Sequence, residues 1–198
     1  MKKEVIPKDA RYVPLTQQKW CCVPTCIQMV MLRHRIPLVS AELMGYYLRI
    51  VVPKADGKLF WNVRTTTKRP KAGYGTQLNE EFTANPMFQK LKIPLRMRWK
   101  LIDTFDSYNA YQKYVKKCIS SGQDVLVCYD YGTLFDDDYH GGHVCVLDRV
   151  YMKKGETRII DPGAKEPKWR TVRIQKLYEA MKYHGRKNMG GFWEVVKR

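Results

Sequence analysis

The sequence CCVPTCIQMVMLR at residues 21–33 sets the architecture that the rest of the chain must fit. Four of its apolar side chains recur at helical spacing and share one face: Cys26, Ile27, Val30 and Met31. Pro24 falls in the first turn, where its missing N–H leaves no hydrogen bond unmade. We therefore predict a helix from Cys22 to Arg33, which Ile36-Pro37 prevents from continuing.

The segments that follow change from helical to strand-like patterns along the chain. Further helices are predicted at residues 41–48 after the N-cap Ser40, 107–119 and 174–183. Short apolar runs bounded by turn residues predict buried strands at 125–129, 144–147, 158–160 and 192–196. Helices dominate the first half and strands the second. This order predicts an α+β fold in which antiparallel strands pack against the N-terminal helix.

The middle of the chain fits neither period. Residues 53–100 are rich in Pro and Gly and carry two basic clusters, at 68–71 and 96–100. We predict a basic, irregular insertion with short helices around 79–82 and 86–91. No linker or repeat divides the sequence, so we predict a single domain over residues 1–198.

The composition describes a basic globular chain. It has 198 residues, 44% of them hydrophobic, which excludes a disordered chain. A formal charge of +17 would attract an acidic protein, an anionic membrane surface or, nonspecifically, nucleic acid. No apolar run is long enough to span a membrane. The N-terminal residues 1–9 are basic without an apolar stretch, so no secretory signal peptide is predicted.

The cysteines point to a reducing compartment, and one of them to chemistry. The six are irregularly spaced, without a disulfide framework or a zinc motif: Cys21, Cys22, Cys26, Cys118, Cys128 and Cys145. We predict a cytoplasmic location. Cys22 opens the first predicted helix, where the helix dipole stabilises a thiolate. Cys21 is a lesser candidate, because only one of the pair can face a base. The others fall within apolar patterns and are predicted as core residues.

A base and its partner follow in the strand-rich half. His143 opens an apolar strand after two glycines and is suited to proton transfer near neutral pH. Asp161 ends the next strand and opens an Asp-Pro-Gly turn, where it would either shape the turn or orient an imidazole. His34 and His184 are interpreted as helix-end or surface residues. His140 beside an acidic run offers a metal site, but its spacing matches no zinc motif, so no metal is predicted.

Together these residues resemble the papain-like cysteine peptidase superfamily, most closely its double-glycine leader peptidase-like branch. The matching segments are a preceding glutamine (Gln17 or Gln18), Cys22–Thr25, Gly142–Val144 and Ile160–Pro162. The resemblance spans roughly residues 13–183. It departs from the family at Val23, where a glycine is usual, and in a shorter glutamine-to-cysteine spacing.

The resemblance implies a papain-like fold and a Cys-His-Asp triad that works without a cofactor or metal. Cys22 would be the nucleophile, His143 the acid and base, and Asp161 the group that orients the imidazole. Gln17 or Gln18, with the backbone N–H of Cys22, would stabilise the oxyanion. The predicted function is a cysteine peptidase or isopeptidase, a hydrolase acting on a protein or peptide. The basic charge favours an acidic substrate.

Two alternatives stay open at this level. An acyltransferase or amidase would use the same residues, because transpeptidation differs only in the nucleophile that resolves the thioester. A catalytically inactive binding module for nucleic acid or acidic protein would use the positive charge instead. Basic and aromatic residues at 96–100 would then contact a polyanion.

Overall fold

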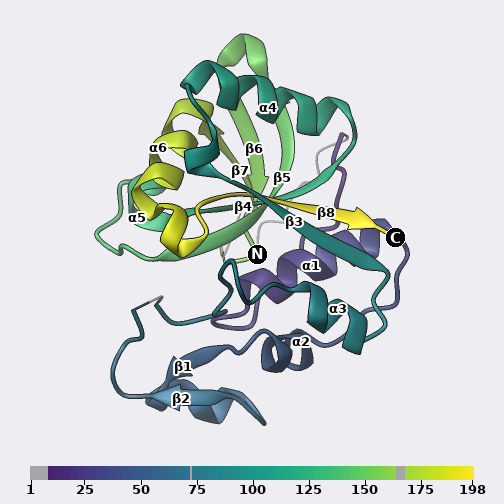
Figure 1. The fold of residues 1–198 in the computed structure, drawn as a ribbon, viewed down its shortest axis with the longest axis vertical. Helices are drawn as coiled ribbons and strands as arrows, with labels where there is room; N and C mark the ends of the chain where they lie inside the picture. Colours follow the sequence, from purple (N-terminus) through teal and green to yellow (C-terminus); the bar gives the residue numbers. More distant parts are fainter. Residues whose placement is uncertain (1–8, 72, 164–167) are drawn as a thin grey trace, which may run out of the picture.

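Helix α1 forms over Cys22–Arg33, as predicted, and lies against one face of a six-stranded sheet (Figure 1). The computed structural model describes residues 9–71, 73–163 and 168–198, so most of the basic N-terminal segment 1–9 lies outside the described residues. The other helices are α2 (Ala41–Tyr47), α3 (Asn85–Lys90), α4 (Tyr108–Ser120), α5 (Tyr131–Phe135) and α6 (Ile174–His184). Short 3-10 turns lie at Lys54–Leu59, Ile102–Thr104, Met152–Lys154 and Arg186–Asn188.

The main sheet is antiparallel throughout, in the order β3-β8-β4-β5-β6-β7. Its strands are β3 (Leu95–Leu101), β4 (Asp124–Asp130), β5 (Gly142–Tyr151), β6 (Glu156–Ile160), β7 (Trp169–Arg173) and β8 (Gly191–Lys197). The last strand, β8, is inserted between β3 and β4. The predicted α+β fold, with its antiparallel sheet and N-terminal helix, is therefore confirmed.

The sheet separates two hydrophobic layers, because successive side chains of a strand point to opposite faces. Ile27 and Val30 of α1 pack on the face that includes Val146 of β5. On the other face, Leu147 joins the apolar sides of α4 and α6. Figure 1 shows α4 and α6 on one side of the sheet and α1 on the other. The alternation along β5 thus gives each helix layer its own core.

The middle segment is more ordered than predicted. Residues 95–100, the end of the predicted irregular insertion, form strand β3 of the main sheet together with Leu101. A separate parallel pair, β1 (Val51–Pro53) with β2 (Arg64–Thr66), was also not predicted. The helix predicted around 79–82 is wrong. The Asn79 carboxamide oxygen accepts hydrogen bonds from the N–H groups of Glu81 and Phe82, which favours a turn over a helix.

The paired basic and aromatic residues of β3 do not share a surface. Arg96 and Arg98 are exposed on one face of the strand, whereas Trp99 points to the other. The Trp99 ring packs against Trp193 of β8, with ring centroids 6.3 Å apart. In the described parts of the chain, no helix is both long and apolar enough to cross a membrane.

Candidate active site

Cys22 is the first residue of α1 and lines a cavity of about 330 Å³. This cavity is termed the catalytic cavity below. It is bounded by the start of α1, the start of β5 and the loop before β8. The first-turn N–H groups of a helix have no partner within the helix, and its dipole is positive there. The Cys22 thiol is half-buried, so it is both reachable from the cavity and placed where a negative charge is stabilised.

Cys21 faces away from this cavity. Its side chain is fully buried and packs with Ile50 and Val52. Burial, together with the nearby Cys22 and Glu42, raises the pKa of the Cys21 thiol to about 12. A thiol in that state stays protonated near neutral pH, so the helix start separates the two cysteines into one cavity residue and one core residue.

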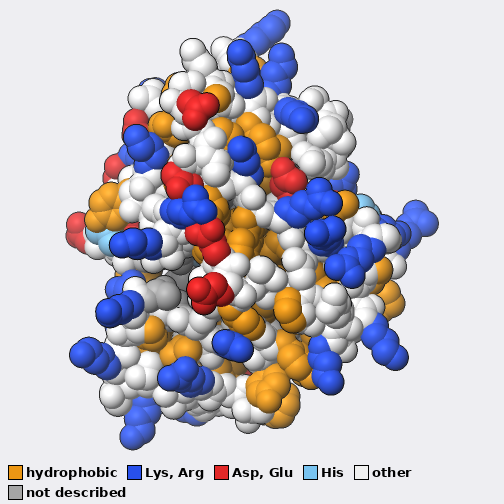
Figure 2. Space-filling view, viewed as in Figure 1, with side chains coloured by type: hydrophobic (Ala, Val, Ile, Leu, Met, Phe, Trp, Pro, Cys, Tyr) orange, Lys and Arg blue, Asp and Glu red, His pale blue; other side chains and the backbone are white. Residues whose placement is uncertain are grey.

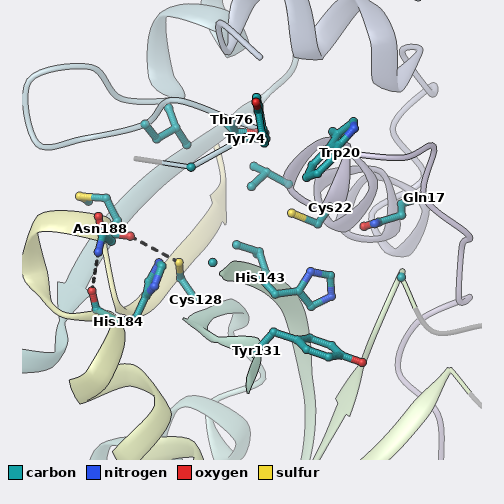
Figure 3. Close-up of a pocket in the computed structure, with 18 of the residues that line it drawn as sticks. Gln17, Trp20, Cys22, Tyr74, Thr76, Cys128, Tyr131, His143, His184 and Asn188 are labelled. Atoms are coloured by element: carbon teal, nitrogen blue, oxygen red, sulfur yellow. Dashed lines mark hydrogen bonds between the residues drawn. The ribbon is translucent and has the colours of Figure 1, made fainter. Parts of the chain in front are cut away.

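His143, the second residue of β5, also lines the catalytic cavity. Its Nε2 atom lies 2.7 Å from Oδ1 of Asp161. That contact leaves Nδ1 as the ring nitrogen available to a second partner. Figure 3 shows the His143 ring and the Cys22 sulfur at the same cavity, with Gln17 beside Cys22. The three predicted groups Cys22, His143 and Asp161 are therefore brought together.

The surroundings of His143 favour its charged form. Burial by itself lowers the pKa of this imidazole, because a buried cation loses hydration. The neighbouring Cys145 and the interactions with Asp161 and Cys22 act in the opposite direction and prevail. The pKa of His143 is consequently well above its usual 6.5. A protonated imidazole at neutral pH is the state that pairs with a thiolate.

Asp161 follows β6 directly and is fully buried. Its Oδ1 atom accepts a second hydrogen bond from the N–H of Gly163, at 2.8 Å. Burial alone raises the pKa of this carboxyl group, but the His143 ring, the Gly163 N–H and the Arg170 guanidinium outweigh it. The pKa of Asp161 therefore lies well below its usual 3.8, and the carboxylate is ionised at any physiological pH.

Arg170 is a site residue that sequence reasoning missed. From β7 its Nη1 atom donates to Oδ2 of Asp161 at 3.1 Å and to the Tyr131 hydroxyl at 3.3 Å. The guanidinium carbon lies 3.3 Å from the centroid of the Phe135 ring. Asp161 is thus held from two sides, by His143 and by Arg170. A single arginine in a strongly basic chain carries no sequence signal that marks this role.

The two candidate glutamines occupy different places. Gln17 lines the catalytic cavity, and its backbone N–H donates to the carbonyl of Pro162 at 2.9 Å. Its side-chain oxygen is buried without a hydrogen-bond partner among the described residues. The Gln18 amide instead donates to the Leu59 carbonyl at 2.8 Å on the surface. Geometry therefore favours Gln17 as the glutamine that faces a substrate.

Cys145 lies on the core side of His143. Its sulfur, a His143 ring nitrogen and an Asp161 oxygen all lie within 4.8 Å of one another. Cys145 is fully buried, its sulfur lies 3.0 Å from the Tyr129 hydroxyl, and burial beside Asp161 raises its pKa to about 11. It does not line the catalytic cavity. This thiol therefore supports the imidazole from behind rather than facing a substrate.

Two of the remaining histidines form ion-pair contacts away from Cys22 and His143, and the third lines the same cavity. His34 caps α1 and its Nε2 lies 2.5 Å from Oδ2 of Asp124, which agrees with the predicted helix-end role. The Nδ1 atom of His140 contacts Asp130 at 2.8 Å. His184 ends α6, as expected, but it is not a simple surface residue. His184 lines the catalytic cavity, and its ring lies against Gly142. A Cβ added to Gly142 would lie 2.7 Å from Cε1 of His184.

The fold has a counterpart among solved structures. No protein-family model matches the chain, and no curated protein matches it in sequence. The fold is similar to the crystal structure of a protein from Bacillus anthracis described as a C39-like peptidase. The two chains are 17% identical, with a TM-score of 0.57 over 94% of this chain and 95% of the other. At this identity the likeness shows a shared fold, and the predicted papain-like architecture is confirmed.

Proposed function

We propose that this protein is a cysteine peptidase that cleaves an amide bond in a protein or peptide. The observation that carries the proposal is that Cys22 and His143 line one cavity while His143 is hydrogen-bonded to the buried Asp161. The similarity of the fold to a C39-like peptidase supports the same class. Nucleophile, acid–base group and orienting group are the three roles that acyl transfer through a thiol requires.

In the first half of the reaction, the Cys22 thiolate attacks the carbonyl carbon of the scissile amide. The carbonyl electron pair moves onto oxygen, which the Gln17 amide and the Cys22 backbone N–H stabilise. When the tetrahedral intermediate collapses, the C–N bond breaks and the His143 imidazolium gives its proton to the departing nitrogen. The amine product leaves, and the acyl group remains bound to Cys22 as a thioester.

In the second half, neutral His143 takes a proton from water as the water oxygen attacks the thioester carbon. The C–S bond breaks, the carboxylic acid product leaves, and the thiolate–imidazolium pair is restored. Throughout, the ionised Asp161 keeps His143 oriented and stabilises its positive charge. An amine in place of water would yield a transferred acyl group, so the product distinguishes peptidase from acyltransferase.

Peptide-library digestion tests the proposal directly. The purified protein is incubated with a mixture of peptides, and new termini are identified by mass spectrometry, with Cys22→Ala as the matched control. We expect cleavage products that the Cys22→Ala protein does not form. Full cleavage by the Cys22→Ala protein would show that the nucleophile is assigned wrongly. Products with an added amine would assign acyl transfer.

A cytoplasmic location stays a prediction, consistent with six free thiols.

A further inference from the structure

A second cavity, of about 470 Å³, adjoins the catalytic cavity and is lined by positive charge. Four of its lining residues are basic, and none of those in the described chain is acidic: Arg49, Arg64, Lys68 and Arg69. We refer to it as the basic cavity. Arg69 lines both cavities, so they meet at this side chain.

The charges of the basic cavity are not neutralised within the described part of the protein. None of its four basic residues forms an ion pair with a described acidic side chain. Nearby basic groups differ in this respect, since Lys19 pairs with Asp56 and Arg186 with Glu80. Uncompensated like charges around one concavity raise the local potential and attract an anion.

The walls of the basic cavity come from a segment whose sequence shows neither helical nor strand periodicity. Val51 of β1 and Arg64 of β2 are paired neighbours in the small parallel sheet, and both line the basic cavity. Figure 2 shows Lys and Arg side chains over the lower part of the molecule, where β1 and β2 lie in Figure 1, and acidic side chains higher on the same face. The small sheet that contributes to the walls of the basic cavity thus lies in a part of the molecule where basic side chains outnumber acidic ones on the face in view.

The aromatic residue of the basic cavity is not free to stack on a nucleic-acid base. The Arg49 guanidinium carbon lies 3.9 Å from the centroid of the Phe82 ring and covers it. Base stacking on exposed aromatic faces is a main source of single-strand binding, and it is missing from this lining. Guanidinium groups instead suit carboxylates, which Arg binds in a bidentate manner.

We propose that the basic cavity binds an acidic stretch of the polypeptide substrate while a neighbouring stretch of the same polypeptide enters the catalytic cavity. This inference rests on the proposed peptidase function. Its structural basis is the Arg69 side chain, which lines both cavities, and the four positive charges that form no ion pair with a described acidic residue. Binding energy from a remote part of the substrate then selects which polypeptides are held at Cys22.

The binding test uses protein that cannot cut the probe. In a Cys22→Ala background, fluorescence anisotropy follows a labelled peptide of alternating Glu and Ser, and a Gln–Ser peptide serves as the uncharged comparison. The cavity variant carries Arg49→Gln, Arg64→Gln and Lys68→Gln. The matched control carries Lys113→Gln, Lys116→Gln and Lys117→Gln on α4, on the far side of the sheet, with the same change of net charge.

We expect the cavity variant to lose acidic-peptide affinity about tenfold or more, and the α4 variant to retain it. Equal losses in both variants would overturn the proposal, because net charge alone would then explain binding. Tighter binding of a single-stranded DNA oligomer through the same residues would overturn it in favour of a nucleic-acid surface. If the triple variant unfolds at a lower temperature, the Arg64→Gln, Lys68→Gln pair, which leaves the Arg49–Phe82 contact intact, decides the outcome.

Cleavage assays separate this inference from the proposed function. The wild-type and cavity-variant proteins, both with Cys22, are compared on an acidic and a neutral peptide that share one cleavage sequence. We expect KM to rise in the variant for the acidic peptide only. A protein that cleaves both peptides with unchanged KM values refutes the acidic-substrate site but keeps the peptidase. A protein that binds the acidic peptide through these residues but cleaves nothing refutes the peptidase alone.

Discussion

His143 Nε2 and Asp161 Oδ1 lie 2.7 Å apart. They are close because β5 begins and the adjacent strand β6 ends at the same end of the sheet. Val146 of β5 pairs with Ile160 of β6, so the residue after β6 lies beside the start of β5. The contact commits one ring nitrogen to the carboxylate and leaves the other for Cys22. The tautomer and orientation of the catalytic imidazole therefore follow from the register of one antiparallel strand pair.

Replacing Asp161 shifts the pH dependence of the reaction. The pKa of His143 in the folded protein is raised above the usual 6.5 of a histidine side chain. The imidazolium and its stabilising contacts are therefore fully present below about pH 6.5, and they are lost as the pH rises through the raised pKa. Asp161→Ala removes one cause of the rise. We expect lower kcat/KM and an alkaline limb displaced to lower pH, with Asp161→Asn less affected because an amide oxygen still accepts from the ring. An unshifted limb would contradict this coupling.

Thiol labelling distinguishes the six cysteines. Low concentrations of iodoacetamide, followed by mass spectrometry, are expected to modify Cys22 well ahead of Cys21, whose buried thiol has a pKa of about 12. Labelling of Cys22 below pH 7 should slow in His143→Ala. Turnover should fall on the order of a thousandfold or more in Cys22→Ala. Preferential modification of Cys21 would reverse the assignment.

The two glutamines are separated by a matched pair of variants. We expect Gln17→Ala to lower kcat on the order of a hundredfold, because one oxyanion donor is lost. Gln18→Ala should change kcat little, since its amide bonds the Leu59 carbonyl on the surface. Cys22 labelling reports whether the nucleophile is still reactive in each variant. A larger loss from Gln18→Ala would exchange their roles.

Arg170 acts on the reaction through Asp161 and is a positioning residue. Arg170→Gln removes the charge that holds Oδ2 but leaves Oδ1 bound to His143. We expect a moderate loss of kcat, an unchanged KM, and a small displacement of the alkaline limb to higher pH, because a positive charge near the His143 imidazolium is removed. If Arg170 only packs against Phe135, stability will fall while the pH profile of the folded protein stays the same.

One backbone position tests how β8 enters the sheet. Gly191 has a φ of +143°, and an added Cβ would lie 2.7 Å from the Lys100 carbonyl oxygen. We expect Gly191→Ala to lower the free energy of unfolding by about 2 kcal/mol or more. Gly122→Ala is the control, because Gly122 has a φ of +70° and open space around it. We expect strain alone to lower its free energy of unfolding by about 1 kcal/mol. Denaturant unfolding of both proteins checks the difference, and equal losses would show that the close approach at β8 is relieved.

Sequence patterns predicted the elements that are strongly apolar on one or both faces. Helix α1 and strands β4, β5 and β6 were found because burial imposes a periodicity that side chains display. Strand β3 alternates Arg96 and Arg98 with apolar residues, as a strand should, but was missed because the Pro and Gly residues before it marked the segment as irregular. Strand β7 was missed because Arg170 and Arg173 make its pattern polar. Edge strands need little apolar surface, so composition hides them.

The same distinction holds for the candidate site. Cys22, His143 and Asp161 could be proposed from the sequence because each stands at the end of an element that the sequence marks. The choice between Gln17 and Gln18 depends on how a loop turns, which no periodicity encodes. Arg170 is recognised only through space, by its contact with Asp161 across two strands.

The position of β8 inside the sheet has a consequence for synthesis on the ribosome. Residues 191–197 are the last described strand to be translated, yet they must pair with β3 on one side and β4 on the other. Before they emerge, the nascent chain holds Cys22, His143 and Asp161 but only two unjoined parts of the sheet. In the part of the chain that the structure describes, the six-stranded sheet is therefore completed only after these residues have been translated, because β8 joins β3 to β4.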